Sequence, residues 1–275
     1  MIRWLHISDL HLNDCNFSSA RLRDELPSFL RNKRMKCDYV FCTGDIRSAN
    51  VSPNSFTEDM ADYMRNICHA VGVPIERLFI VPGNHDVNIF AEGREDAIKH
   101  IVPYDGYYKP DIGHIDTVDL EKLQSGEEDF VDFLSELYDT DRLGLYKDYN
   151  NPHFSIETPD LNVLQVDTTL VNSQCGKAPD FLVGLKKLYT IVRKLNQEKP
   201  TILLTHYPIT SLLQDERKLL SNVLQKNNVR LWLAGHEHDH NLQKMKYLDS
   251  LQSGELHYET EANATILIGE YYSEN

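Results

Sequence analysis

Five short clusters of residues that commonly bind metals recur along this chain of 275 residues. They read DLH, GD, GNHD, H and GHEH, and they occupy residues 9–11, 44–45, 83–86, 206 and 235–238. Carboxylates, imidazoles and amide oxygens are ligands that borderline divalent metals such as Mn, Fe, Zn and Ni accept. Side chains two residues apart in an extended segment point the same way, so Asp9 and His11 can face one site, as can His236 and His238. The pattern indicates a metal centre assembled from distant segments.

Each cluster taken alone also has a structural explanation. Asp9 and Asp45 could cap a turn or a helix after a strand, and Gly83-Asn84 is a common turn pair. His206 could be a hydrogen-bonded loop histidine. The occurrence of all five clusters, each directly after an apolar run, favours the metal site. His240 continues the alternate histidine spacing beyond the last cluster, and we expect it not to bind metal.

The elements that must position these clusters follow from the apolar pattern. Strands are predicted at 2–7, 39–43, 78–81, 153–156, 161–166, 202–205, 229–233 and 264–268. Helical spacing of apolar residues predicts helices at 22–34, 55–70, 91–101, 127–143, 181–196 and 214–226. Strands that alternate with helices indicate an α/β fold with parallel strands, whose carboxyl ends hold the ligands. We expect one domain over residues 1–275, with a helical insertion or cap at about 88–150.

Bulk composition narrows the class of protein further. The net charge of −14 argues against a broad nucleic-acid-binding surface. No segment approaches the roughly 20 apolar residues that a membrane span needs, and the N-terminus lacks a signal-peptide cleavage site. The five cysteines are scattered and form no CxxC pair, which favours reduced thiols. We therefore expect a cytoplasmic protein without a membrane partner, and the oligomeric state stays open.

In type and order the five clusters resemble the motif set of the calcineurin-like metallophosphoesterases, which is D-x-H, G-D, G-N-H-[D/E], H and G-H-x-H. The resemblance covers residues 9 to 238, most of the chain. It implies a four-layer α/β/β/α sandwich with two divalent metals about 3.5–4 Å apart. By the same resemblance Asp9, His11, Asp45 and His238 would bind the first metal. Asp45, Asn84, His206 and His236 would bind the second, so that Asp45 bridges the pair.

The resemblance also implies a reaction. A hydroxide held between the metals would attack phosphorus, because metal binding lowers the pKa of water. Asn84 and His85 would face the substrate, and His85 would donate a hydrogen bond or proton to the phosphate or leaving group. Asp86 could orient the His85 imidazole. Arg47 could bind a substrate phosphate, or it could be a solvated surface residue.

The expected activity is hydrolysis of a phosphomonoester or a phosphodiester. The clusters are closest in style to the cyclic-nucleotide phosphodiesterase-like members. The Asp-Arg-Gly sequence of Ser/Thr protein phosphatases is absent, and Asp86 stands where those enzymes carry Glu, which disfavours a protein phosphatase. Two alternatives remain: a regulatory or binding module of a larger assembly, and a nuclease. The complete set of ligand positions favours catalysis over a regulatory module.

Overall fold

The computed structural model describes residues 1–12, 17–48, 56–101, 115–148, 150–173, 184–212, 214–237, 241–245, 248–252 and 267–271. Ten strands form two sheets in this part of the chain. The first sheet has the order β10-β1-β2-β3 and the second the order β4-β5-β6-β7-β9-β8. The strands are β1 (Ile2–Ile7), β2 (Tyr39–Cys42), β3 (Leu78–Ile80), β4 (His153–Glu157), β5 (Asn162–Val166), β6 (Thr201–Leu204), β7 (Val229–Ala234), β8 (Asn241–Met245), β9 (Leu248–Gln252) and β10 (Leu267–Tyr271).

Parallel pairing runs through the middle of both sheets. The pairs β1–β2 and β2–β3 are parallel, as are β5–β6, β6–β7 and β7–β9. Antiparallel strands lie at the edges: β10 pairs with β1, β4 with β5, and β8 with β9. Each parallel strand therefore ends at the same side of its sheet as its neighbours.

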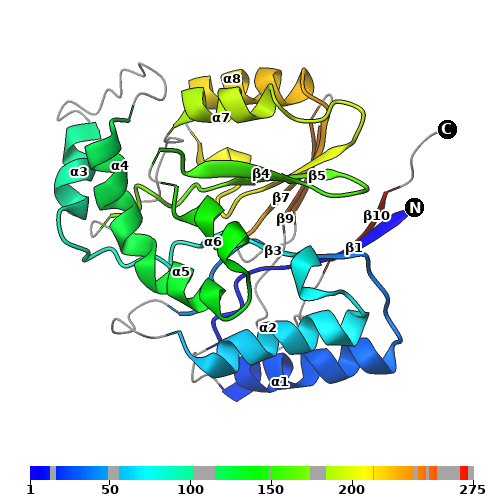
Figure 1. Cartoon of the computed structure of the whole chain (residues 1–275). Coiled ribbons are helices and arrows are strands. Elements are labelled where there is room, and N and C mark those ends of the chain that lie inside the picture. Colours follow the sequence, from blue (N-terminus) through cyan, green and yellow to red (C-terminus); the bar gives the residue numbers. More distant parts are fainter. Residues whose placement is uncertain are drawn as a thin grey trace.

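Helices cover the outer faces of the two sheets (Figure 1). The helices α1 (Phe17–Asn32) and α2 (Glu58–Val71) lie on the first sheet, and α7 (Leu185–Val192) and α8 (Gln214–Gln225) lie on the second. Between β3 and β4 the chain forms α3 (Arg94–Ile101), α4 (Thr117–Gln124), α5 (Glu128–Ser135) and α6 (Thr140–Tyr146). Short 3-10 helices occupy Ile75–Arg77, Ser125–Glu127 and Ile209–Ser211.

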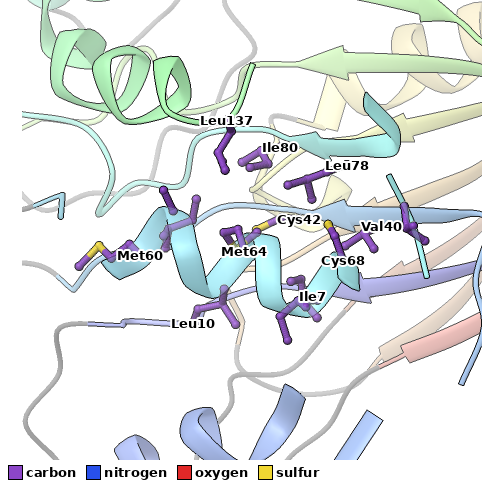
Figure 2. Packing of buried hydrophobic residues seen from close by; sticks show 14 of the residues in the cluster. Ile7, Leu10, Val40, Cys42, Met60, Met64, Cys68, Leu78, Ile80 and Leu137 are labelled. Carbon is purple, nitrogen blue, oxygen red and sulfur yellow. The ribbon is translucent and has the colours of Figure 1, made fainter. Parts of the chain in front are cut away.

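Alternation of buried side chains along the strands produces the layers. Successive strand residues point to opposite faces, so a strand buried on both sides contributes to two cores. In β2, Val40 and Cys42 pack toward the helices, whereas Tyr39 and Phe41 pack between the sheets. Figure 2 shows the outer core of the first sheet, where Met60, Met64 and Cys68 of α2 meet the strand side chains.

Side chains of both sheets interleave in the inner core, which joins Trp4, Phe41 and Phe79 to Val163, Leu204 and Leu233. A third cluster lies between the second sheet and α7 and α8, around Trp232 and Leu188. The layers are thus helix, sheet, sheet and helix, and the predicted α/β/β/α sandwich is confirmed.

Several element boundaries differ from the expectations. The helix predicted over 127–143 is two helices, because the Asp139 carboxylate caps α6 by accepting a hydrogen bond from the Arg142 amide. The helix predicted over 55–70 begins at Glu58 within the described residues. Helix α4 and the β8–β9 hairpin have no counterpart in the sequence prediction. The expected boundary of a single domain over 1–275 stays a prediction. No helix of the described residues is long and apolar enough to cross a membrane.

Candidate metal centre

The predicted ligands follow the carboxyl ends of parallel strands from both sheets. Asp9 and His11 follow β1, Asp45 follows β2, and Asn84 follows β3. In the second sheet His206 follows β6 and His236 follows β7. Because the two sheets pack face to face, these strand ends meet and their side chains converge.

The backbone bends sharply at the positions that carry the ligands. Asp9, His11, Asp45 and His236 all have positive φ angles, of 54°, 44°, 54° and 76°. Residues other than glycine rarely adopt this left-handed conformation, and such strain is concentrated at functional sites. The conformation turns each side chain out of the strand direction and toward the shared edge of the sheets.

The loop after β3 passes so close to Asp45 that residue 83 must be glycine. A Cβ atom on Gly83 would lie 2.1 Å from both the amide nitrogen and the Oδ1 atom of Asp45. The Asp45 Oδ1 atom also accepts a hydrogen bond of 2.8 Å from the His85 amide. The glycine therefore lets the loop after β3 seat the Asp45 carboxylate.

Three donor atoms of the expected second metal site lie against one another. Asn84 Oδ1 is 2.8 Å from His206 Nε2 and 3.0 Å from His236 Nδ1. His206 Nε2 is also 3.5 Å from Asp45 Oδ2. All four residues that the resemblance assigns to the second metal are thus joined in one group.

The tautomer of His206 shows that a cation suits this group. His206 is fully buried, and burial, followed by the nearby His236, lowers the pKa of His206 well below its ordinary value, so the ring is neutral. The His206 Nδ1 atom lies 2.7 Å from the Thr43 carbonyl oxygen, which can only accept, so Nδ1 carries the proton. The Nε2 lone pair then faces the Asn84 Oδ1 lone pairs. The two atoms are both acceptors and lie 2.8 Å apart. A cation that binds both lone pairs would stabilise this arrangement.

Asp45 belongs to two groups of possible ligands. Its carboxylate lies within 4.8 Å of ligand atoms of Asp9 and His206 in one group, and of His11 and His85 in the other. Both Asp9 and Asp45 are buried. Buried carboxylates are normally paired or bound to metal, so two converging carboxylates favour divalent cations here. The donor set fits the borderline metals expected from the sequence.

His11 is oriented in the same way as His206. Its Nδ1 atom lies 3.3 Å from the Arg47 carbonyl oxygen, so Nδ1 donates and Nε2 is left as a ligand. The Asp9 carboxylate accepts from the His236 amide at 3.2 and 3.1 Å. This contact connects the first strand end of one sheet to the last ligand segment of the other. His238, the remaining predicted ligand, and His240 lie outside the described residues.

The His85 imidazole is more solvent-accessible than that of His206. Its side chain is 30% exposed, whereas that of His206 is fully buried. Its Nδ1 atom lies 3.9 Å from Asp45 Oδ2, and its ring centroid is 5.0 Å from that of His11. His85 is therefore placed beside the ligands with one side open to a substrate. Its assignment as a residue that does not bind metal stays a prediction.

Asp86 connects the loops that carry the ligands. It is fully buried, and its Oδ1 atom accepts from the amides of Ile46 and Arg47, at 3.0 and 3.1 Å. Its Oδ2 atom accepts from the Gly83 amide at 2.8 Å. These bonds fasten the loop after β2 to the loop after β3. The predicted role of Asp86 in orienting the His85 imidazole is not tested by these contacts.

Arg47 is buried, which excludes the alternative of a solvated surface residue. Its Nε atom donates to the His85 carbonyl oxygen at 2.8 Å, and Nη2 donates to the Asp86 carbonyl oxygen at 3.2 Å. Its guanidinium carbon lies 4.8 Å from the centroid of the Phe56 ring, and Nη1 is 3.8 Å from Asp129. These contacts make Arg47 a support of the His85 loop. Its predicted role in binding substrate phosphate stays a prediction.

Asn172, which the sequence analysis missed, holds the backbone of the predicted ligand Asn84. Asn172 Nδ2 donates to the Asn84 carbonyl oxygen at 2.9 Å. Asn172 is itself held by Arg94, whose Nε and Nη2 atoms donate to its carbonyl oxygen at 3.3 and 3.2 Å. The signal in the sequence was a sixth polar cluster, Asp167-Thr168-Thr169, which directly follows β5 and leads to Asn172.

The two packed sheets, with a carboxylate and histidine centre at their shared edge, define a metallophosphoesterase sandwich. A family model for calcineurin-like phosphoesterases matches residues 2–240, and the chain belongs to that family. The chain is 27% identical over 249 residues to an uncharacterized metallophosphoesterase-like protein, YydB, of Bacillus subtilis (strain 168). That match covers 86% of this chain and 49% of the relative, so the chain spans about half the length of that protein.

A solved structure shows the same fold. A dimetal phosphatase from Danio rerio superposes with a TM-score of 0.50 at 13% sequence identity. The match covers 93% of this chain and 88% of that one. At this identity the likeness concerns the fold alone. Together with the family match, it agrees with the architecture derived from the residue contacts.

Proposed function

We propose that this chain is a hydrolase that uses two divalent metal ions to cleave a phosphomonoester or phosphodiester. The observation that carries the proposal is the position of the buried Asp45 carboxylate, which belongs to two groups of possible ligands, one of them with the 30% exposed His85. A carboxylate shared in this way suits two cations side by side, because it offsets their mutual repulsion. Metal ions bound here would lower the pKa of water and polarise a phosphoryl oxygen.

The resemblance assigns the ligands of the two ions. Asp9, His11, Asp45 and His238 would hold one ion. Asp45, Asn84, His206 and His236 would hold the other, and Mn, Fe, Zn and Ni all suit these ligands.

His85 would contribute on the open side of the centre. Its imidazole would donate a hydrogen bond or a proton to the phosphate or to the leaving oxygen. The Arg47 and Asp86 contacts to the His85 loop support this role, because they limit the positions that the imidazole can take. Proton transfer by a positioned side chain contributes about 10²–10⁴-fold to a rate.

The substitution His85→Asn tests the role of this residue. We expect the variant to keep the metal content of the unmodified protein, measured by mass spectrometry, and to lose at least about 100-fold in kcat. The exposed His69 on α2 provides a matched control, and His69→Asn should leave both quantities unchanged. Full turnover by His85→Asn would contradict the assignment.

The substrate class requires an activity panel. The panel compares p-nitrophenyl phosphate, bis(p-nitrophenyl) phosphate, cyclic nucleotides and short oligonucleotides with Mn²⁺ added. The similarity in motif style to the cyclic-nucleotide phosphodiesterase-like members predicts activity on a diester. Hydrolysis of none of these compounds, with metal bound, would instead support a regulatory module. A steep salt dependence of oligonucleotide binding would support a nuclease.

A further inference from the structure

A small, partly open cavity lies between the sheet edge and the helices that follow β3. Its volume is about 20 Å³, which is room for one water molecule or one ion. Gln124 and Glu127 line it from the end of α4 and the adjoining 3-10 helix. Gln165 and Asp167 line it from the end of β5. None of these four residues belongs to the metal centre described above.

The four side chains are deeply buried, and all of them offer oxygen. They are 7%, 6%, 1% and 6% exposed for Gln124, Glu127, Gln165 and Asp167. The atoms Gln124 Oε1, Glu127 Oε1 and Gln165 Oε1 accept no hydrogen bond from any residue that the structure describes. A buried oxygen without a partner destabilises a fold by about 1–3 kcal/mol, so three in one place call for a ligand.

The hydrogen bonds of the amide groups set the direction of their oxygen atoms. Gln165 Nε2 lies 3.2 Å from the Ile80 carbonyl oxygen, which can only accept, so the amide nitrogen must occupy that side. The same nitrogen donates to the Tyr146 hydroxyl at 2.8 Å, and that hydroxyl donates to Ile80 at 2.7 Å. Gln124 Nε2 is likewise directed to the Asp148 carbonyl oxygen, at 3.4 Å. Both amide oxygens are thereby left without a donor.

The nearby guanidinium group of Arg94 does not donate hydrogen bonds to these oxygens. Arg94 is fully buried, and all of its described hydrogen bonds go to carbonyl oxygens, those of Leu123, Thr169, Leu170 and Asn172. Burial, and then the neighbouring Asp167, raises the pKa of Glu127 well above its ordinary value. Arg94 is near enough to lower that pKa, but in the described part of the chain it donates no hydrogen bond to either carboxylate. Asp167 Oδ1 accepts from the amide and hydroxyl of Thr169, at 2.7 and 2.9 Å.

We propose that this cavity binds a hard divalent cation, calcium in the first place, through the side-chain oxygens of Gln124, Glu127, Gln165 and Asp167. A water molecule has only two protons to donate, whereas a cation can be shared by all the oxygens. Calcium accepts carboxylate and amide oxygens in irregular geometry, whereas magnesium keeps several of its waters, for which this cavity has no room. The absence of histidine separates the site chemically from the centre around Asp45.

A second, larger cavity shares three lining residues with the first. It measures about 230 Å³ and is also lined by Gln124, Glu127 and Tyr146. Glu128, Asp132 and Lys147 border it as well, so acidic side chains outnumber basic ones along it and would attract a cation. A bound ion would join the end of α4 to the end of β5. The site is therefore expected to stabilise the fold.

Calcium-dependent melting of the full chain tests the proposal. With the histidine centre loaded with Mn²⁺, calcium at about 100 times its Kd should raise Tm by roughly 5 °C. The variant Asp45→Asn, which impairs the histidine centre, should keep this shift. Glu127→Gln should lose it, because the amide keeps the shape of the carboxyl group and removes its charge. The matched control Glu121→Gln, at an exposed position of α4, should keep it.

Two results would overturn the proposal: no change of Tm at millimolar calcium, or an equal shift in Glu127→Gln and the unmodified chain. A crystal structure of the unmodified chain grown with calcium gives a second test that does not depend on the folding of any variant. Anomalous density with oxygen ligands at about 2.3–2.6 Å would support the site. A water molecule at ordinary hydrogen-bonding distance from two of these oxygens would refute it.

Discussion

The substitution Gly83→Ala should damage metal binding without changing any ligand. An added Cβ would lie 2.1 Å from the Asp45 amide nitrogen and from Asp45 Oδ1, about 0.9 Å short of the 3.0 Å below which real Cβ contacts essentially never occur. Both neighbours are held in place, the nitrogen by the backbone and Oδ1 by the His85 amide. The Asp45 carboxylate must therefore move by about 1 Å.

The size of the effect follows from the position of Asp45. A misplacement of about 1 Å at a reacting centre can lower a rate by about 10²-fold, and loss of a contact that orients a metal ligand lowers metal affinity by about 10–100-fold. Because the proposed function places Asp45 at both metal positions, we expect the affinity at both positions to fall by at least 10-fold. Competition with a fluorescent chelator would measure the affinities, and mass spectrometry would measure the number of ions bound.

A matched control is available in α6. A Cβ added at Gly144 meets no atom within 4 Å. Gly144→Ala should therefore leave metal affinity unchanged and stabilise the helix by about 0.5–1 kcal/mol. Unaltered metal binding by Gly83→Ala would refute the reasoning, because the loops after β2 and β3 would then be able to separate without disturbing Asp45.

Three further outcomes can be measured. Arg94→Lys should lower the free energy of unfolding in urea by about 3–5 kcal/mol, because an ammonium cannot reach every carbonyl oxygen that the buried guanidinium binds. Burial lowers the pKa of His6 from 6.5 to about 3, so between these pH values only the unfolded chain is protonated there. Stability should therefore decrease as pH falls below 6.5, by up to about 1.4 kcal/mol per unit, and His6→Gln should reduce this slope. Asn172→Ala, which removes the bond to Asn84, should weaken metal binding by about 10-fold or more, whereas Asn222→Ala, at an exposed position, should not.

Local sequence determined where the strands end and which side chains follow them. Strand β1 was predicted with its observed bounds, and β2, β3, β6 and β7 within one or two residues, because each is a short apolar run that stops at a polar or glycine residue. The same pattern named Asp9, Asp45, Asn84 and His206 as candidates for one site. The sequence alone could not show that these donors converge.

Tertiary structure decided that convergence, because it depends on the packing of two sheets whose strands are far apart in the chain. His206 meets the Thr43 carbonyl across 163 residues, and Arg94 meets Asn172 across 78. Contacts of this kind leave no periodic signal in the sequence, and they explain why the support by Asn172 was missed. The pairing of β10 with β1 is equally non-local. Residue types supplied the chemistry of the centre, and long-range packing brought its atoms together.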